Sequence, residues 1–551
     1  MREVEIPVLV VGGGPVGLTL AADLAWRGQR CMIVEQRTEP TDHPKATLLG
    51  SRSMEHYRRW QLDAPIFEAG LPQAHGYFIV FATRLCGHEL HRFASPSVAE
   101  VRGASPEAQA RWPELRWSPY SKTQIGQQAL EPVLLDFARG LRPAIDFRHG
   151  WRLLEFADHG DHVYARIECL QSGEQQAVRA RYLVGCDGGS STVRKALGIR
   201  LSGRGRMRSN VSFFFRSREF LATHTLGPAN LYFIFTPDSF GVVTAIDGQE
   251  LWNYQHYFLD PAQQTDKLDA TTILHRAMGK SFSFELLKTT HWSHHQAVAR
   301  QWQSGRVFLA GDAAHLFPPT GGVGMNTGIG DAVDLAWKLD ATLRGWSGAQ
   351  LLASYERERK PVAIRNSIVS ANNSDKIDMV MDETPADIET PGAAGDARRR
   401  ELARKIRWFA KQFNSAGVHL GARYVDSPLC VADGTPEPPD DPTQLVPSTW
   451  PGSRAPHHWL APGRSTLDFF GRDFVLLSFG EPIEAAAELA SAFAERSIPL
   501  RVAALDDAVA ARLYETKWVL VRPDGYVAWR GDRLPHDPLS LVDRVRGALA
   551  D

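Results

Sequence analysis

Two glycine-rich turns, each placed between an apolar strand and a helix, limit most strongly what this chain can fold into. The first turn, Gly12-x-Gly14-x-x-Gly17, follows the apolar stretch Ile6–Val11, and the second lies within Gly311–Asn326. Glycine lets backbone N–H groups approach a ligand closely, and the N-terminus of a helix attracts negative charge. The two turns therefore predict one nucleotide cofactor that is held at two places far apart in the sequence.

The first turn matches a dinucleotide-binding fingerprint in the context that the fingerprint requires. A second apolar strand, Cys31–Val34, follows the predicted helix and ends at Glu35. We expect Gly12 to permit the tight turn, Gly14 to admit a pyrophosphate and Gly17 to pack helix against strand. Glu35 is expected to accept hydrogen bonds from ribose hydroxyls. The other residues predicted to line this half of the site are Pro15, Val16, Gln36 and Arg37.

The second turn begins where an apolar strand ends at an acidic residue. Asp312 is expected to accept hydrogen bonds from sugar hydroxyls, and the glycines that follow would bring backbone N–H groups to an electron-rich ring. Two such half-sites in one chain point to a flavin. His315, beside Asp312, is expected to order the turn rather than to act in catalysis.

Length, charge and cysteine content limit the class of protein. The chain has 551 residues and a formal net charge of −1, which predicts neither a nucleic-acid partner nor a membrane partner. Five dispersed cysteines without a CxxC pair predict free thiols in a cytoplasmic protein, and no metal site is predicted. Homodimer formation is left open.

The order of the predicted elements indicates an α/β chain with mixed α+β character. Strands rich in aromatic and β-branched residues between 211 and 258 predict an antiparallel sheet inserted between the two halves of the nucleotide site. The predicted divisions are 1–75, 110–200 and 290–375 for a discontinuous nucleotide-binding domain, 76–109 and 201–289 for the antiparallel-sheet domain, 376–450 for a helical and Pro-rich linker, and 451–551 for a thioredoxin-like domain without CxxC.

A third segment, Asp187-Gly188-Gly189-Ser190-Ser191-Thr192-Val193-Arg194, completes a pattern of three motifs. With all three, the chain resembles the single-component FAD-dependent aromatic hydroxylases, and in particular their phenol and polyketide hydroxylase branch. The resemblance extends from residue 6 to about residue 535. It implies a Rossmann-like FAD-binding domain, an inserted substrate-binding domain and a C-terminal thioredoxin-like domain without the redox cysteines.

The resemblance also implies roles for individual residues. Asp187 and Gly188 would lie beside the flavin and the path of the pyridine nucleotide, Arg52 and Gln127 would lie near the pyrophosphate, and Asp312 would bind the ribityl chain. It implies that Pro318 and the backbone amides from Gly321 to Asn326, among them Gly322, Gly324 and Met325, line the isoalloxazine, and that Gly311 and Pro319 also bind the cofactor. The chain departs from the family at Val323, where glutamine is common, and at Asp334, where asparagine is common; neither change removes a backbone donor.

The activity implied by the resemblance is monooxygenation. NADPH or NADH would reduce the flavin, and the reduced flavin would react with O2 to form a C(4a)-hydroperoxide that transfers oxygen to a phenolic ring. Two alternatives stay open: Baeyer–Villiger oxygenation of a polyketide ketone, and a flavin- or ligand-binding protein without turnover.

The sequence leaves the group that activates the substrate open. The candidates besides Pro318 are polar side chains of the inserted sheet: Tyr232, Tyr254 and His256, with His291, His294 and His295 beyond them. The many aromatic residues of this sheet predict a neutral or weakly acidic phenolic substrate, from one ring to a polycyclic polyketide. Arg216 and Arg218 remain as partners for a carboxylate.

Overall fold

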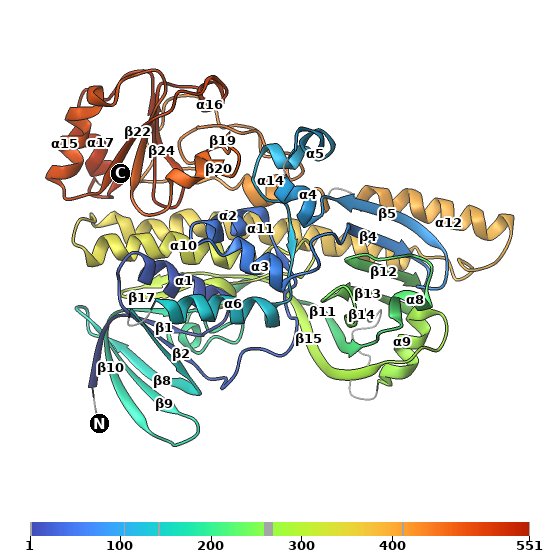
Figure 1. Cartoon of the computed structure of the whole chain (residues 1–551). Helices are drawn as coiled ribbons and strands as arrows, with labels where there is room; N and C mark the ends of the chain where they lie inside the picture. Colours follow the sequence, from blue (N-terminus) through green and yellow to red (C-terminus); the bar gives the residue numbers. More distant parts are fainter. Residues whose placement is uncertain (1–2, 104, 142–143, 258–267, 410–412, 550–551) are drawn as a thin grey trace.

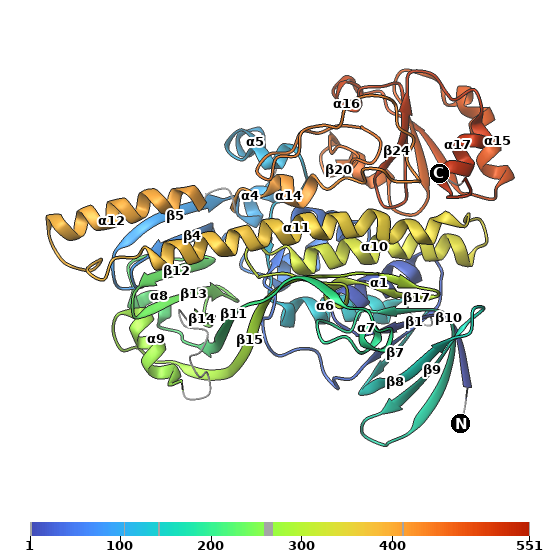
Figure 2. The ribbon, with the colours of Figure 1, turned by 180° about the vertical axis from the view of Figure 1, so that it is seen from behind.

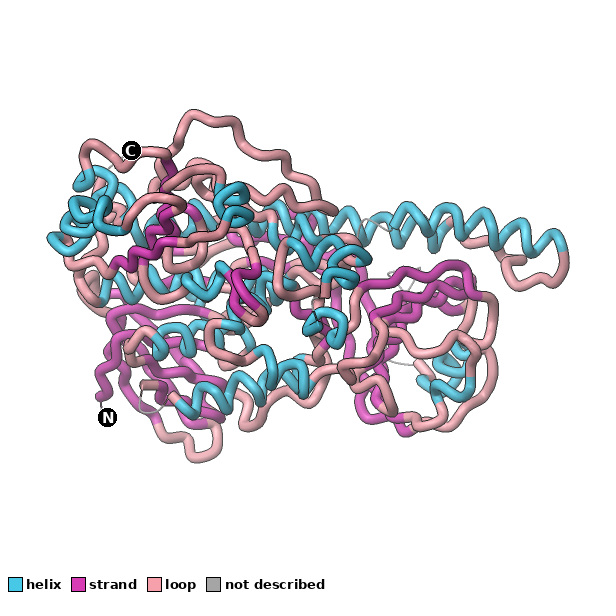
Figure 3. Tube along the Cα trace, turned by 45° about the horizontal axis from the view of Figure 1, so that its top comes forward, coloured by secondary structure: helices cyan, strands magenta, loops and turns pink. Residues whose placement is uncertain are grey.

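A computed structural model describes residues 3–103, 105–141, 144–257, 268–409 and 413–549. Within these ranges the chain forms two large sheets, a smaller C-terminal sheet and short strand pairs (Figure 1). Figure 3, which draws every strand in magenta, shows the strands of the two large sheets in two separate groups. In the same ranges, no helix combines the length and the apolar character that a membrane crossing requires.

The first large sheet is the core of the predicted FAD-binding domain and has the strand order β16-β17-β10-β1-β2-β7. Strands β1, β2, β7, β10 and β17 run parallel, so their carboxyl ends meet at one edge. Helix α1 packs against both α6 and α10. The bounds are β1 (Glu3–Val11), α1 (Pro15–Trp26), β2 (Cys31–Glu35), β3 (Leu48–Leu49), α2 (Ser51–Arg58), α3 (Asp63–Ala69), β6 (Thr123–Gln124), α6 (Gln127–Gly140), β7 (Ile145–His149), β8 (Trp151–Asp158), β9 (Val163–Cys169), β10 (Gln175–Gly185), α7 (Thr192–Ala196), β16 (Gln303–Ser304), β17 (Val307–Leu309) and α10 (Gly324–Leu343).

The second large sheet forms the predicted substrate-binding domain and has the strand order β18-β15-β11-β14-β13-β12-β4-β5. Strands β4 and β5, from the 76–109 segment, belong to this sheet. The prediction extended one strand to Phe258, which lies outside the described residues. The bounds are β4 (Tyr77–Ala82), β5 (Glu89–Ser95), β11 (Leu201–Arg216), α8 (Phe220–Thr223), β12 (Leu231–Thr236), β13 (Ser239–Ala245), β14 (Leu251–Tyr257), α9 (Ala270–Met278), β15 (Glu285–Ala299) and β18 (His315–Leu316).

The two faces of this second sheet have different neighbours. Phe213, Tyr232 and Tyr254 lie on the outer face, which packs against α8 and α9. Because side chains alternate along a strand, the residues next to them lie on the opposite, inner face. The inner face packs against α11 (Gln350–Asp382) and α12 (Ala393–Ile406) and contacts the first domain through Leu48.

Helices α11 and α12 correct the predicted linker. α11 continues without a break from the first domain past residue 376, and α12 contributes Leu402 and Ile406 to the hydrophobic core of the inner face. Figure 2 shows both helices extending along the same side of the second sheet. The predicted linker therefore includes part of the cover of the substrate-binding domain; its residues 410–412 lie outside the described ranges.

The C-terminal sheet has the strand order β22-β21-β23-β24. Its parallel pair is joined by a helix, and an antiparallel hairpin and a closing helix follow, which is the order that the sequence indicates. A relationship to thioredoxin stays a prediction. The bounds are α14 (Ala416–Leu420), β19 (Trp459–Ala461), β20 (Arg464–Ser465), β21 (Phe474–Ser478), α15 (Ala487–Glu495), β22 (Leu500–Ala504), α16 (Ala508–Tyr514), β23 (Trp518–Val521), β24 (Val527–Gly531) and α17 (Pro538–Val545).

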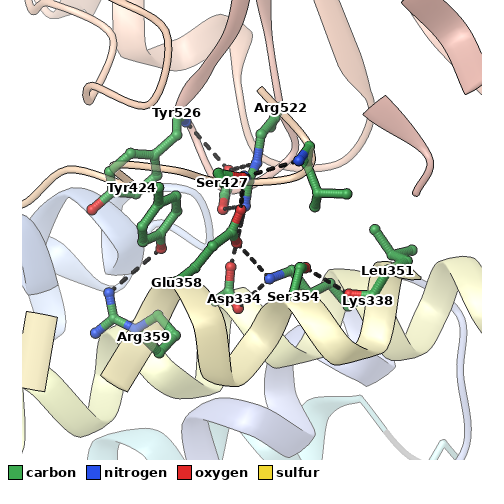
Figure 4. Close-up of polar contacts among 12 residues, drawn as sticks. Asp334, Lys338, Leu351, Ser354, Glu358, Arg359, Tyr424, Ser427, Arg522 and Tyr526 are labelled. Atoms are coloured by element: carbon green, nitrogen blue, oxygen red, sulfur yellow. Dashed lines mark hydrogen bonds and ion pairs between the residues drawn. The ribbon is translucent and has the colours of Figure 1, made fainter. Parts of the chain in front are cut away.

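Buried ion pairs join the C-terminal domain to the first domain. Arg522 reaches from the C-terminal hairpin to Asp334 on α10 and to Glu358 on α11 (Figure 4). Independently, Nε of Arg454 lies 2.8 Å from Oε2 of Glu55 on α2, and the Ser118 hydroxyl donates to the same carboxylate at 2.6 Å. The contact between the two domains is therefore built from specific charge pairs as well as apolar packing.

Glu55 is expected to make the stability of this contact depend on pH. Burial alone would raise the pKa of Glu55, but the charges of Arg454 and Arg52 outweigh burial and lower it to about 2. Because the folded-state pKa lies below the ordinary value of about 4.5, the stabilisation is complete above pH 4.5 and is lost as the pH falls towards 2. Urea unfolding measured from pH 7 to pH 2 should therefore show a decrease of about 3 kcal/mol that the Glu55→Gln variant lacks. A variant with the same pH dependence as the parent would contradict this assignment.

Candidate functional site

The turn after β1 has the geometry that close approach of a phosphate requires. Gly12 has φ +108°, and a Cβ there would lie 2.3 Å from the carbonyl oxygen of Cys186. A Cβ on Gly17 would lie 2.0 Å from the Gly12 carbonyl oxygen, whereas one on Gly14 would meet no protein atom within 4 Å. Helix α1 begins directly after Gly14 with no side-chain cap and no acidic residue in its first turn. Its amino end therefore presents positive partial charge beside an open space, which fits a pyrophosphate.

Glu35, at the carboxyl end of β2, is held as an ionised acceptor. It accepts hydrogen bonds from the Gly13 N–H at 2.7 Å and from the Arg37 N–H at 2.9 Å. Burial acts to raise the pKa of Glu35, but these hydrogen bonds outweigh it and the pKa is lowered. Each carboxylate oxygen can accept more than one hydrogen bond, so Glu35 retains capacity for the ribose hydroxyls. Gln36, the next residue, is exposed.

Glu131 on α6 is a residue that the sequence analysis missed. Gln127 Nε2 donates to Glu131 at 2.7 Å, and Arg37 Nη1 lies 3.3 Å from the same carboxylate. Glu131 also accepts from the Thr41 N–H at 2.8 Å. The structure thus brings the predicted residues Gln127 and Arg37 together through a buried acid. The four-residue spacing from Gln127 on one helix was the signal that could have indicated Glu131.

The two glycine-rich turns meet in space, as the sequence analysis expected. A Cβ on Gly311 would lie 2.9 Å from Cγ2 of Val16, and one on Gly328 would lie 2.7 Å from the same atom. Val16, which follows the first turn, therefore packs directly against the second turn and against α10. The position of Val16 is explained by this packing.

Asp312 follows β17 at the start of the second glycine-rich turn. Its side chain is exposed, yet desolvation by the surrounding protein raises its pKa, and the charges of His315 and Lys45 oppose the rise. His315 instead bonds Asp331, with 2.7 Å between Nε2 and Oδ2, and Asp331 also accepts from the Gly311 N–H at 3.2 Å. His315 therefore orders the turn. Asp312 remains accessible to sugar hydroxyls.

The segment between Pro318 and Asn326 is fixed by its neighbours. Ser370 on α11 donates to the Pro318 carbonyl at 2.6 Å. The Asn326 side chain accepts from the Gly50 N–H at 2.7 Å and donates to the Leu48 carbonyl at 3.0 Å. Asn326 thus joins this segment to the loop at 48–50, and its side chain is largely occupied by that role. Pro319 is exposed, Gly322, Gly324 and Met325 are partly exposed, and α10 begins with neither a side-chain cap nor an acidic residue.

Asp187 caps a helix and is connected to the second turn. Its Oδ2 accepts from the backbone N–H groups of Thr192 at 2.7 Å and Val193 at 3.1 Å, and Gly188 beside it has φ +78°. Arg194 is buried and donates to the Ala313 carbonyl at 2.9 Å. The three motifs therefore share one region of the first domain.

Arg52 does not occupy the place that the resemblance implied. Its guanidinium lies over the ring of Tyr526, donates to the Asp524 carbonyl at 2.7 Å and pairs with Glu55 at 2.9 Å. These partners place Arg52 in the contact with the C-terminal domain, so the assignment to the pyrophosphate is corrected. Lys45 is an exposed cation whose charge acts to lower the pKa of Asp312. It is a candidate cofactor-binding residue that the sequence analysis missed.

Tyr232, Tyr254 and His256 also require correction as substrate-activating groups. The Tyr232 hydroxyl donates to the Gly227 carbonyl at 2.6 Å, and the Tyr254 hydroxyl lies 3.1 Å from Oγ of Ser239. His256 shares their face by strand alternation. All three lie on the outer face under α8 and α9, with the sheet between them and the first domain.

Comparison with known proteins agrees with this geometry. Residues 5–368 match the family model described as FAD binding domain, and residues 448–549 match the one described as aromatic-ring hydroxylase, C-terminal. The chain belongs to the FAD-dependent aromatic hydroxylases. FAD is the cofactor of this family, and the exposed Asp312 and the open side of Gly14 fit it.

Relatives of this hydroxylase match it over almost its whole length. A putative polyketide hydroxylase of Streptomyces halstedii is 36% identical over 96% of this chain and 93% of its own. The rebeccamycin biosynthetic enzyme RebC, solved with reduced flavin, superposes with a TM-score of 0.90 at 38% identity and full coverage of both chains. Aklavinone-11 hydroxylase, solved with FAD and aklavinone, gives a TM-score of 0.82 at 29% identity, covering 99% of this chain and 100% of its own.

Proposed function

We propose that this hydroxylase uses NADPH or NADH and O2 to hydroxylate a phenolic compound of the aromatic polyketide type. The observation that carries the proposal is the meeting of the two glycine-rich turns, at Val16 and Gly311, in the domain that contacts the inner face of the second sheet. The named substrates and pathways of the similar proteins support the choice of a fused-ring phenol. The free cysteines support a cytoplasmic reaction.

The residues of the first domain divide the work of holding FAD. The turn at Gly12–Gly17 and the start of α1 would hold the pyrophosphate, and Glu35 would hold the adenosine ribose. Asp312 would bind the ribityl hydroxyls, and the N–H groups at the start of α10 would face the flavin ring. Bound FAD supplies the two-electron chemistry that links the pyridine nucleotide to O2.

The remaining residues would position the phenol and exclude water. Ser370 holds Pro318 in place, and Asn326 holds the loop at 48–50 against the start of α10. The apolar surface for the rings of the substrate would be the part of the inner face that meets the first domain at Leu48. A site that excludes water would favour transfer of oxygen to the phenol over release of hydrogen peroxide.

Oxidation of NADPH or NADH by the FAD-loaded protein tests this function. The panel should contain single-ring phenols and fused-ring phenols, and hydrogen peroxide should be measured beside coenzyme oxidation. We expect one fused-ring phenol to accelerate oxidation at least about tenfold with little peroxide, since substrate binding couples reduction to oxygen transfer. If no compound accelerates oxidation, or if all consumed coenzyme appears as peroxide, the proposed function is wrong.

The Tyr254→Phe variant is a control for the face of the sheet on which the substrate binds. Tyr254 lies on the outer face, so removing its hydroxyl should leave the ratio of product to coenzyme unchanged. A variant that binds FAD normally but produces only peroxide would place Tyr254 at the substrate after all.

A further inference from the structure

A cavity lies at the contact between the C-terminal domain and the first domain. It is lined by α2, α10 and α11, by the segment 418–424, and by Asp524 and Tyr526 of the C-terminal hairpin. Its volume is about 530 Å³ when it is counted out to its open mouth. The contact between the two domains therefore has room for a small ligand.

This cavity is separate from the predicted place of the cofactor. Val323, Thr327 and Gly330 line it from one face of α10, because residues three and four apart share a face of a helix. Gly328, on another face, packs against Val16 of the first glycine-rich turn. Helix α10 therefore presents different faces to the cavity and to the turn that would hold the pyrophosphate.

Three nitrogen atoms of the residues that line the cavity have no hydrogen-bond partner among the described residues. They are Nε of Arg52, Nδ1 of His56 and Nε2 of His419. His56 is only 3% exposed and His419 only 8%, so bulk water does not satisfy them. Buried polar groups without a partner are rare in folded proteins, and an ordered ion or water completes most of them.

Both histidine rings are neutral and lie in a positive field. Burial lowers the pKa of His56 well below its usual value and that of His419 to about 3. Four positive charges lower the pKa of His56 further: Arg52, Arg59, Arg359 and Arg454. A neutral imidazole carries one N–H, and the Nε–H of an arginine is always a donor. The unpaired groups of the cavity therefore supply donors to a ligand that accepts hydrogen bonds.

The arginines on and beside α2 outnumber their carboxylates. Glu55 is shared by Arg52, at 2.9 Å, and by Arg454, at 2.8 Å. Among the described residues, Arg59 forms no ion pair, and it donates to the Asp524 carbonyl at 3.1 Å. An anion in the cavity would offset this excess of positive charge, whereas a water molecule would not.

The other charges that line the cavity are already paired. Arg359 lies 2.9 Å from Asp331, and Asp524 lies 2.6 Å from Arg522. The rest of the wall includes apolar side chains that offer no donors: Val333, Val362 and Val418. An anion with several acceptor oxygens would leave some of them unpaired against this wall, so the cavity favours a monoatomic anion.

We propose that this cavity binds one small monovalent anion, chloride under cellular conditions, between Arg52, His56 and His419. The ion accepts hydrogen bonds from Nε–H of Arg52 and from one N–H of each ring. Because the Arg52 guanidinium also holds the Asp524 carbonyl, the ion stabilises the contact between the first domain and the C-terminal domain. The site is independent of the reaction proposed above.

Crystals of the FAD-loaded protein grown in sodium bromide locate the ion directly, because bromide replaces chloride and scatters anomalously. We expect an anomalous peak in the cavity, within hydrogen-bonding distance of Arg52 and of the two imidazole rings. Peaks only on the surface or beside the flavin, with water in the cavity, overturn the proposal.

Thermal unfolding measures the same site in solution. Chloride is compared with gluconate, a large hydroxylated anion, at one ionic strength so that general screening is equal. We expect chloride to raise the Tm by roughly 2–5 °C relative to gluconate, since a ligand that binds only the folded state stabilises it. Equal Tm values in the two salts contradict the proposal.

Two variants assign the donors. His56→Leu and His419→Leu should each remove most of the shift in Tm caused by chloride, whatever their own Tm. His224→Leu is the matched control, because His224 is also buried with an unpartnered ring nitrogen but does not line this cavity. The control should keep the chloride shift, and cavity variants that keep it contradict the assignment. If neither cavity variant folds, the bromide crystals of the unchanged protein still decide.

Discussion

Replacing Arg522 by methionine is expected to lower the free energy of unfolding by about 3–5 kcal/mol, because the change leaves buried carboxylates without their partner. The Arg522 guanidinium lies 2.5 Å from Glu358, 2.6 Å from Asp524 and 3.3 Å from Asp334. Lys338 is the other cation of the cluster, 2.6 Å from Glu358 and 2.8 Å from Asp334. All five side chains are nearly inaccessible to solvent, so water cannot replace the lost contact.

The charge balance of this cluster gives a second, opposite expectation. Three carboxylates face two cations, so the cluster is neutral only when one carboxylate holds a proton. Burial raises the pKa of Asp334, and the negative charges of Glu358 and Asp524 add to the rise. Asp334→Asn should therefore change stability little at neutral pH. Combined with Arg522→Met, it should restore part of the lost stability, because one uncompensated charge is removed.

Urea unfolding of the FAD-loaded protein, together with calorimetry of the unfolding of its C-terminal domain, measures both effects. Lys517→Met is the matched control, since Lys517 forms an exposed pair with Glu481 at 2.6 Å and should contribute less than about 1 kcal/mol. If Arg522→Met costs no more than Lys517→Met, the buried cluster does not hold the domains together. A double variant less stable than Arg522→Met alone would contradict the charge balance.

The glycine-rich motifs could be predicted from the sequence because their requirements are local. Gly12 needs a positive φ, and Gly17 needs close contact with a backbone carbonyl. Both needs are met by glycines of a single short turn, so the sequence of that turn is enough to predict them. The order of the strands and helices was predictable for the same reason. Contact between Val16 and Gly311 follows once both turns are assigned to a single cofactor.

Which residues of the substrate-binding sheet lie on its inner face could not be predicted in this way. Strands β12 and β13 are buried on both sides, so their residues show no alternation of apolar and polar character that would identify the inner face. Tyr232, on β12, was therefore placed by composition alone. Arg52 was misplaced because its partner, Asp524, lies in another domain and leaves no signal near residue 52.

Replacing Gly12 by alanine is expected to lower the affinity for FAD by about a hundredfold or more. The substitution forces a side chain into φ +108° and places its Cβ 2.3 Å from a backbone carbonyl oxygen, which cannot move aside as a flexible side chain would. Strain of this kind costs on the order of 1–3 kcal/mol at one residue before the clash is added. Flavin fluorescence during titration of the apoprotein measures the loss.

The Gly14→Ala variant separates distortion of the turn from obstruction of the cofactor. Gly14 has an ordinary φ of −75°, and a Cβ there would meet no protein atom within 4 Å. The apoprotein should therefore keep its stability, and any loss of FAD affinity must come from contact between the new methyl group and the cofactor. Unchanged affinity in Gly14→Ala would mean that the pyrophosphate does not approach this turn. Loss of affinity in both variants, with loss of apoprotein stability only in Gly12→Ala, would assign the turn to the cofactor.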